Sequence, residues 1–348
     1  MRTAVFHWCA TGGSLHVAKY LAKALKSKLY SFLDCDDIID ISHLLPLHLR
    51  PFKHKRAFDY LCWSSIDIAE LGNYDFIITS GHTTRAIVTP PDVIHVHYLH
   101  HPPKSLYFYN SKSLFAELFR VWDRSIDKNV DNYFCNSPIT RYNLQKYYKR
   151  DGVVLYPPIE TSKYKFKEYS DFYLHIGRID KEKMVNVAVN ACLKAKRKLI
   201  LIGTKGNDKA TYKHLIKLTK ASPYVEYLGD VSESEKYKLL SECKAVLYPS
   251  VNEDFGLVVA ESLASGKPII VSNSGFPQYV VKQKSCGVVA EPNQISFVNA
   301  IHKLESIQWN HNKLISMSKE YDYKVFKVRL LYWLKKWYNE NSLYSSAR

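Results

Sequence analysis

Two acidic residues at a fixed spacing are the most distinctive chemical feature of the sequence. Glu253 and Glu261 lie eight positions apart, the first in a polar turn and the second inside an apolar run typical of a helix. Phe255 and Gly256 open that run, so free backbone N–H groups at its start are available to an anion. Two carboxylates beside an anion are costly unless they bind cations or hydroxyl groups, such as those of a ribose or a sugar. A simpler explanation is a helix that carries acidic residues near its N-terminus, which the helix dipole favours.

Basic residues follow a second apolar run. Gly177 and Arg178 come directly after the run 172–176, and Lys183 lies five positions beyond Arg178. An arginine offers a forked donor and a lysine a point charge, and both suit phosphate oxygens. A solvated charged loop would have the same composition, so this segment alone does not decide between the two.

A pair of glycines separates the first strand-like run from the first helical pattern. Gly12 and Gly13 allow a tight turn there, and the start of the helix offers N–H groups to an anion. The spacing is not that of the dinucleotide-binding fingerprint. A plain turn with Ser14 as the N-cap would explain the segment equally well.

Four histidines crowd the end of another strand-like run, at His95, His97, His100 and His101. No carboxylate or cysteine lies close by in sequence to complete a metal site, so we expect no metal here. A histidine at the carboxyl end of a parallel strand is instead well placed to meet a ligand.

Continuous apolar runs alternate with helical patterns along most of the chain, as in sheets whose strands are buried on both faces. The strand-like runs are 3–6, 76–79, 93–96, 133–135, 153–155, 172–176, 199–202, 225–227, 245–248 and 269–271. This alternation predicts an α/β, doubly wound architecture with too many strands for one domain. Pro157 and Pro158 end one strand before a Lys-rich stretch, which favours a break there. We therefore expect domains at 1–160 and 161–322, with a helical segment at 323–348 that packs back on the first domain.

Apolar and basic residues share the C-terminal stretch 323–337 at helical spacing. The apolar positions are Phe326, Leu330, Trp333 and Trp337, and the basic positions are Lys324, Lys327, Arg329, Lys335 and Lys336. A packed terminal helix and a membrane-surface contact both fit this pattern. A second basic run consists of Arg50, Lys53, Lys55 and Arg56, with Phe52 and Phe58. It is either a solvated loop or a docking segment for an anionic membrane or a lipid-phosphate acceptor.

Charge and composition limit the class of protein. The 348 residues include 49 Lys and Arg against 33 Asp and Glu, a formal net charge of +16, which indicates an anionic partner. No stretch of 18 apolar residues predicts a membrane span, and the start lacks the features of a signal peptide. The seven cysteines form no CxxC pair, so buried free thiols in a reducing compartment are expected. We therefore expect a cytoplasmic protein, with a peripheral position at the cytoplasmic membrane face as a further hypothesis.

Taken together and in this order, the motifs resemble those of the retaining glycosyltransferases of family 4. Glu253 and Glu261 match the E-x7-E signature, and Arg178 and Lys183 match the G-R-L-x-x-x-K motif. The stretch 98–109, YLHHPPKSLYFY, resembles the YxHTPxRYxW stretch of members that use GDP-mannose. The resemblance implies the GT-B fold, in which two Rossmann-like domains face a central cleft.

The resemblance also implies roles for individual residues. Arg178 and Lys183 would bind the donor diphosphate, Glu253 the hydroxyls of the transferred sugar, Glu261 the ribose, and His100 would lie near the sugar. Further donor-binding positions implied in the same way are Gly12, Gly13, Gly177, Gly203, Asp254, Phe255, Gly256, Leu257 and Val258.

The implied reaction is transfer of a hexose from a nucleotide-diphosphate sugar to a glycan or lipid-linked acceptor. The family is thought to use same-face attack and needs no metal ion or other cofactor. GDP-mannose is the favoured donor, but His101, Lys104 and the stretch 274–278 depart from the family pattern and keep UDP-sugars open. Two alternatives are a basic nucleic-acid-binding protein and a nucleotide-sugar-binding protein without transfer. The first predicts cations interleaved with surface aromatics and no paired glutamates, so no nucleic acid partner is expected.

Overall fold

The chain forms two compact units in the computed structural model. The structure describes residues 1–8, 12–33, 37–53, 58–108, 113–168, 170–206 and 208–346, with side chains through residue 342. Unit 1 consists of Met1–Pro158 and Phe326–Arg348, and unit 2 consists of Ile159–Val325. The boundary therefore falls directly after the two prolines, two residues before the end of the first domain expected from the sequence.

Unit 1 contains a seven-stranded sheet in the order β3-β2-β1-β4-β5-β6-β7. The strands are β1 (Thr3–His7), β2 (Lys28–Ser31), β3 (Ile39–Asp40), β4 (Phe76–Ser80), β5 (Ile94–Leu99), β6 (Asn132–Cys135) and β7 (Val153–Val154). All neighbouring strands pair in parallel. The order of the strands reverses between β1 and β4, and such a switch point is where ligands bind in open α/β sheets.

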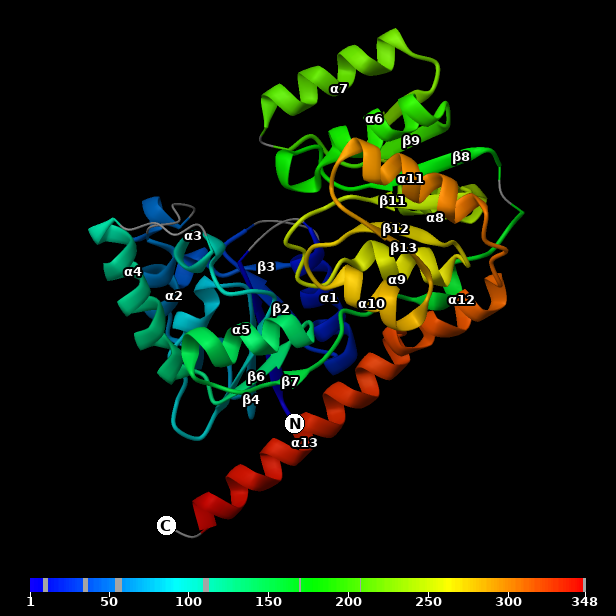
Figure 1. Ribbon diagram of the computed structural model, residues 1–348. Helices are drawn as coiled ribbons and strands as arrows, with labels where there is room; N and C mark the ends of the chain where they lie inside the picture. Colours follow the sequence, from blue (N-terminus) through cyan, green and yellow to red (C-terminus); the bar gives the residue numbers. More distant parts are fainter. Residues whose placement is uncertain are drawn as a thin grey trace. The chain divides into compact units, whose positions relative to one another are not determined.

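Helices cover both faces of this sheet (Figure 1). They are α1 (Gly13–Leu25), α2 (Asp59–Ser64), α3 (Lys104–Tyr107), α4 (Leu114–Ser125), α5 (Pro138–Tyr148) and, from Phe326 on, α13 (Tyr323–Ser346). The buried apolar residues of α13 are Phe326, Leu330, Leu334 and Trp337. The Trp337 ring lies 4.8 Å from that of Phe134 in β6. The C-terminal helix is therefore packed against unit 1, with Leu334 rather than Trp333 in the buried row.

Unit 2 contains a six-stranded sheet in the order β10-β9-β8-β11-β12-β13. Its strands are β8 (Phe172–Ile176), β9 (Lys198–Ile202), β10 (Val225–Gly229), β11 (Ala245–Tyr248), β12 (Ile269–Ser272) and β13 (Gly287–Ala290). All of these pair in parallel. The order matches that of unit 1, and its switch point lies between β8 and β11.

Seven helices of unit 2 flank its sheet. They are α6 (Val185–Ala195), α7 (Lys209–Ala221), α8 (Glu233–Glu242), α9 (Leu257–Ala264), α10 (Pro277–Lys284), α11 (Gln294–Glu305) and α12 (His311–Ser318). Figure 1 shows α6, α7 and α11 on one side of the sheet and α9, α10 and α12 on the other. The chain also forms short 3-10 turns, η1 (Ser42–Leu44), η2 (Arg50–Phe52), η3 (Ile68–Leu71), η4 (Thr83–Ala86), η5 (Ile126–Asn129), η6 (Thr161–Lys163), η7 (Lys181–Lys183) and η8 (Lys319–Tyr321).

The doubly wound α/β prediction is confirmed in both units. All ten strand-like runs are strands, and β2, β3 and β13 are strands that the apolar pattern did not reveal. The first two are short and partly polar, and β13 begins at a glycine, so their sequences resemble loops.

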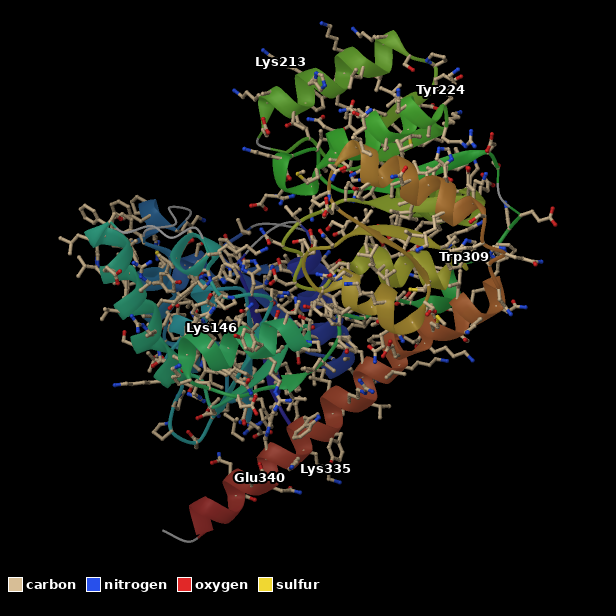
Figure 2. The ribbon with its side chains drawn as sticks, viewed as in Figure 1. Lys146, Lys213, Tyr224, Trp309, Lys335 and Glu340 are labelled. Atoms are coloured by element: carbon tan, nitrogen blue, oxygen red, sulfur yellow. The ribbon has the colours of Figure 1, made fainter. Side chains whose placement is uncertain are left out.

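Surface charge and buried thiols agree with the composition. The five described cysteines, Cys62, Cys135, Cys192, Cys243 and Cys286, are free and buried, whereas Cys9 and Cys35 lie outside the described residues. Figure 2 shows three exposed lysines on outer helix surfaces, Lys146 of α5, Lys213 of α7 and Lys335 of α13. In the described part of the chain, no helix is both long and apolar enough to cross a membrane.

Candidate functional site

The carboxyl ends of β8 and β11 bring the two predicted motif segments of unit 2 together. The amide of Val251 donates to the carbonyl of Glu182 over 3.2 Å, and that of Phe276 donates to the carbonyl of Glu253 over 2.8 Å. The loops after β8, β11 and β12 are therefore joined by backbone hydrogen bonds. This junction is the switch point of the sheet, where the strand order favours a ligand.

Lys183 and Glu253, which are 70 positions apart in sequence, form an ion pair at this edge. Their side chains are 18% and 19% exposed, and the ammonium lies 5.8 Å from the centre of the Tyr248 ring. Burial acts to lower the pKa of Lys183, but Tyr248 and Glu253 outweigh it and raise that pKa above its ordinary value. The lysine is therefore a fixed cation at neutral pH.

Arg178 supplies a second, more accessible cation. Its side chain is 56% exposed, and its guanidinium lies 3.4 Å from the Asp180 carboxylate. The same carboxylate caps η7 by accepting the backbone N–H of Lys183 over 3.2 Å. Asp180 thus fixes the turn that carries both cations and leaves the Arg178 fork open to solvent.

Two glycines make the close approach of these loops possible. A Cβ at Gly203 would lie 2.2 Å from the Gly177 carbonyl oxygen, and its φ is +134°. Gly256 has a φ of +79°, and a Cβ there would lie 2.9 Å from Pro277. Larger residues would therefore separate the loops that follow β8, β9, β11 and β12.

Helix α9 begins at this edge without a side-chain cap. Gly256 is its N-cap and makes no side-chain hydrogen bond, whereas Asp208 and Ser232 cap the more peripheral helices α7 and α8. Backbone N–H groups in the first turn of a helix have no partner within the helix. The start of α9, at Leu257 and Val258, can therefore receive an anion.

The neighbouring residues 254 and 255 have different surroundings. Phe255 is buried, with its ring 6.1 Å from that of Phe276 and 5.6 Å from that of Tyr321. Its side chain anchors the loop, so a ligand could use only its backbone. Asp254 lies in the same loop between Glu253 and Phe255.

Glu261 lies in α9 and is paired with a lysine of its own. Its Oε1 accepts from Lys236 Nζ over 3.0 Å and from the Tyr164 hydroxyl over 3.1 Å. The sequence reasoning missed Lys236 and Tyr164, because α8 and the residues that follow the domain boundary carry no signal for this contact. The structure thus gives each glutamate of the signature its own cation, and Glu261 already holds two donors.

His175 lies beneath the basic turn. Its Nδ1 is 2.9 Å from the Leu247 carbonyl oxygen, and Nε2 has no hydrogen-bond partner among the described residues. Burial lowers the pKa of His175 to about 4, so the imidazole is neutral at pH 7. Its sequence carries no signal for a role in a site, because β8 is a run of mostly buried residues.

In unit 1 the corresponding edge carries neutral groups. His100 Nε2 lies 2.9 Å from the Ser80 hydroxyl, and His7 Nδ1 lies 2.8 Å from the Ser80 carbonyl oxygen. Burial lowers the pKa of His7 to about 4 and that of His100 well below its ordinary value. The ends of β1, β4 and β5 thus place two uncharged imidazoles and a hydroxyl together.

An aromatic residue beside them was missed by the sequence reasoning. The Trp8 indole lies over Gly81, where a Cβ would come within 1.8 Å of the ring. Its centre is 6.0 Å from that of His82. The position of Trp8 directly after an apolar strand was the available signal, because residues that end parallel strands meet at the same edge.

The glycine turn after β1 leaves helix α1 uncapped. Gly12 is the N-cap, with a φ of 88° and no side-chain hydrogen bond, and Gly13 is the first helical residue. The explanation in which Ser14 caps the helix is therefore wrong, because Ser14 lies inside it. Thr11 lies outside the described residues.

His95 and His97 of the cluster have core partners. The Thr79 hydroxyl lies 2.8 Å from His95 Nε2 and 2.8 Å from His97 Nδ1. Both rings are fully buried. No group of three or more histidine, cysteine or acidic side chains in the described ranges has a geometry that could hold a metal ion.

The described members of the basic run in unit 1 are used within their own loop. Arg50 donates to the carbonyls of Leu45 over 3.0 Å and His43 over 2.6 Å. Lys53 donates to the Ser42 hydroxyl over 2.8 Å. Lys55 and Arg56 lie outside the described residues.

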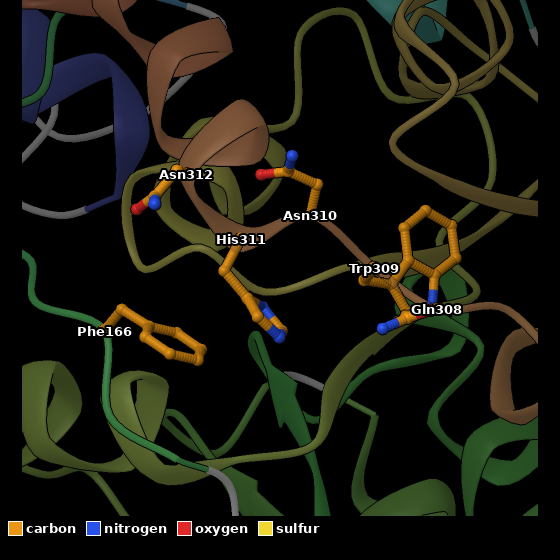
Figure 3. Close-up of a pocket in the computed structure, with 6 residues that line it drawn as sticks. All are labelled: Phe166, Gln308, Trp309, Asn310, His311 and Asn312. Atoms are coloured by element: carbon orange, nitrogen blue, oxygen red, sulfur yellow. The ribbon is translucent and has the colours of Figure 1, made fainter.

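A separate pocket of about 620 Å³ in unit 2 contains none of the predicted site residues (Figure 3). It is lined by Phe166, Gln308, Trp309, Asn310, His311 and Asn312. His311 stacks on Phe166 and bonds the Gly266 carbonyl over 2.7 Å. Gly266 precedes β12, so the pocket lies at the amino ends of the strands, away from Lys183.

Comparison with known proteins agrees with the geometry. Residues 158–321 match the model of the family "Glycosyl transferases group 1". The chain is 31% identical to the human alpha-1,3/1,6-mannosyltransferase ALG2 over 147 aligned residues. The alignment covers 37% of this chain and 35% of the relative. It is 26% identical over 266 residues to the Dictyostelium discoideum ALG2, covering 62% and 63%. It is 25% identical over 201 residues to the Escherichia coli O-antigen chain mannosyltransferase B, covering 56% and 49%. The matched chain thus spans less than two thirds of the length of these relatives.

Solved structures of glycosyltransferases share the fold across nearly the whole chain. Anabaena HepE in complex with UDP has a TM-score of 0.72 at 15% identity and covers 97% of this chain and 100% of its own. Sucrose-phosphate synthase from Thermosynechococcus elongatus has a TM-score of 0.73 at 16% identity, covering 98% and 100%. The chain therefore has the GT-B fold of glycosyltransferases, its residues 158–321 match the group 1 glycosyl transferases, and mannosyltransferases are among its relatives.

Proposed function

We propose that this chain is a hexosyltransferase that moves a sugar from a nucleotide-diphosphate donor to a glycan or lipid-linked acceptor. The observation that carries the proposal is the Lys183–Glu253 ion pair beside the open Arg178 side chain. These groups lie at the switch point of unit 2, where the sheet topology favours a nucleotide. A diphosphate would meet two cations and the start of α9 there.

In the proposed reaction, the bond between the anomeric carbon and the donor phosphate breaks. A new bond forms between that carbon and the acceptor oxygen on the same face, and the acceptor proton passes to the departing phosphate. Negative charge therefore develops on the nucleoside diphosphate, where Lys183, Arg178 and the helix N-terminus would stabilise it. No metal or other cofactor enters this scheme.

Donor binding would exchange the partner of Lys183. Without donor, Glu253 accepts from the lysine. A phosphate oxygen would take the place of the carboxylate, and Glu253 could then bind hydroxyls of the sugar. Glu261, held by Lys236 and Tyr164, would present its carboxylate to the ribose as part of a preorganised group. His100 would lie near the sugar, as the family resemblance implies.

GDP-mannose is the donor that we favour, because the curated relatives named above are mannosyltransferases. UDP-sugars are the alternative, and the fold neighbour HepE was solved with UDP. A cytoplasmic location completes the proposal and rests on the free thiols and the nucleotide-sugar donor.

A panel of nucleotides and nucleotide sugars tests the proposal by thermal unfolding and by donor hydrolysis. GDP-mannose, UDP-glucose, UDP-galactose and UDP-N-acetylglucosamine would be compared with GDP and UDP. One donor and its nucleotide should raise the melting temperature, and slow hydrolysis of that donor should release the nucleotide. The shift should vanish in Lys183→Met, which removes the cation paired with Glu253.

The matched control is Lys181→Met, because Lys181 lies in the same turn but is exposed. It should keep the shift produced by the donor. If no nucleotide sugar raises the melting temperature of the wild-type chain, the transferase proposal fails at its first step. Stabilisation without hydrolysis or transfer would instead favour a binding protein.

A further inference from the structure

Helix α4 of unit 1 turns its apolar side toward solvent. Leu114, Phe115, Leu118 and Val121 are 72%, 74%, 58% and 61% exposed. These four residues, which we term the α4 apolar face, lie within two turns of one helix. Amphipathic helices ordinarily bury this side against the core, and contiguous exposed apolar surface marks an interaction site.

A buried ion pair sets the rotation of the helix. Asp123 lies on the side of α4 opposite Leu114 and Leu118 and forms an ion pair with Arg85, and both side chains are 0% exposed. The same carboxylate accepts from the hydroxyls of Tyr60, Tyr107 and Tyr148, over 2.9, 2.9 and 2.5 Å. A rotation of α4 that buried its leucines would remove the Asp123 carboxylate from Arg85 and the three tyrosine hydroxyls. It would leave the Arg85 charge buried without this partner, which costs stability. The outward apolar face is therefore imposed by the packing.

Further contacts hold the helix in place. The Ser113 hydroxyl caps it by accepting from the Ala116 amide over 3.2 Å, and Ala116 itself is buried. Arg120 Nη1 donates to the Leu106 carbonyl in α3 over 2.7 Å. In Figure 1, α4 lies at the outer edge of unit 1 beside α3. These contacts hold α4 with its apolar face toward solvent.

The charges around the α4 apolar face are predominantly positive. Glu117 is the exposed acidic residue of α4, and Arg120 pairs with it. Arg124 and Lys128 are exposed and form no ion pair with any described residue. They follow the four apolar residues in sequence, Arg124 in the last turn of α4 and Lys128 in η5 just beyond it. An apolar stripe with cations at its border suits a bilayer that contains anionic lipids.

We infer that the α4 apolar face docks unit 1 onto an anionic lipid bilayer. The four apolar side chains enter the boundary between headgroups and acyl chains, and Arg124 and Lys128 contact lipid phosphates. The net charge of +16 attracts the chain to such a surface. This inference concerns where the chain is held and does not depend on the proposed reaction.

Vesicle flotation of the full chain tests the inference. The wild-type chain should bind vesicles of equal parts phosphatidylcholine and phosphatidylglycerol and bind phosphatidylcholine alone more weakly. The double substitution Phe115→Gln and Leu118→Gln should weaken binding by at least about tenfold. The substitution Arg124→Gln with Lys128→Gln should weaken binding several-fold and remove most of its dependence on phosphatidylglycerol.

A matched control uses exposed apolar residues on other helices. Ile295 and Val328 are 74% and 68% exposed, and Ile295→Gln with Val328→Gln should leave vesicle binding unchanged. Melting temperatures should stay equal, because all of these side chains face solvent. Equal binding by the Phe115/Leu118 variant, equal loss in the control, or no binding by the wild type would overturn the inference. So would a wild-type dimer that the Phe115/Leu118 variant abolishes, because a second copy would then cover the face.

Discussion

The two sheets have the same strand order but opposite chemistry at their switch points. In unit 2 the carboxyl edge holds charged groups, the Lys183–Glu253 pair and the exposed Arg178. In unit 1 it holds the neutral imidazoles of His7 and His100 around Ser80. The topology decides only where a ligand can be met, and the side chains at that place decide which ligand it is.

Charge is also used differently inside the two units. Unit 1 buries the Arg85–Asp123 pair completely, and the hydroxyls of Tyr60, Tyr107 and Tyr148 donate to its carboxylate. In unit 2 the two cations of the predicted site, Arg178 and Lys183, lie at the sheet edge and are partly exposed. The buried pair orients α4, whereas the edge cations can meet an incoming anion. Three experiments test this contrast.

Acidification should destabilise unit 1 more than unit 2, and this is the largest effect. Burial lowers the pKa of five histidines of unit 1, His7, His82, His95, His97 and His100, against His175 alone among the described residues of unit 2. Each contributes stability above its unfolded pKa of 6.5, and this stability is lost as the pH falls through the folded value, about 4 for His7 and His95. Those two alone contribute about 3 kcal/mol each at pH 7.

Tryptophan fluorescence can follow this loss between pH 7 and pH 4. Five of the six tryptophans, at 8, 63, 122, 333 and 337, belong to unit 1. The melting temperature that these tryptophans report should fall faster with decreasing pH than the melting temperature of unit 2. Unit 2 can be followed through Trp309 in a variant that lacks the other five tryptophans. His7→Asn should flatten the pH dependence, whereas the exposed His302→Gln should not change it. Equal decline of both units would contradict the contrast.

Loss of the buried carboxylate should come next in size. Asp123→Ala leaves the Arg85 guanidinium buried beside a cavity, so unit 1 should lose about 3–5 kcal/mol of unfolding free energy. Chemical denaturation measures this loss. Asp151→Ala is the control, because Asp151 pairs with Arg141 at the surface, where it is 58% exposed, and such pairs contribute at most about 1 kcal/mol. Similar losses of unfolding free energy in both variants would contradict the larger contribution assigned to the buried Asp123.

The edge cation should affect activity rather than folding. Lys183→Ala should lower the transfer rate by on the order of 10²-fold or more, because it removes a fixed charge from the departing diphosphate. Denaturation midpoints should change little, since Glu253 retains access to water. Lys181→Ala, in the same turn, should retain its rate. Full activity in Lys183→Ala would remove that residue from the proposed mechanism.

Much of the fold was predictable because strands buried on both faces leave continuous apolar runs. Ten strands were found in this way. The strands β2, β3 and β13 were missed, because they are short and include a polar residue or a glycine. The position of Lys183 and Glu253 was predictable in principle, since each follows a strand and parallel strands end at the same edge.

Other contacts carried no local signal. The pairing of Lys236 with Glu261 and the packing of Trp8 on Gly81 join segments far apart in sequence. The outward face of α4 is another case, because its pattern is that of any amphipathic helix. Only Asp123 and its partners decide which side is buried.

The sequence by itself therefore determined the alternation of strands and helices, the break after Pro158 and the identity of the residues at the strand ends. These are local properties, set by apolar periodicity, proline and glycine. The tertiary structure alone decided which charges are paired, which histidines lose their charge and which side of α4 meets solvent. Those properties depend on burial and on distances between residues that the chain brings together only when it folds.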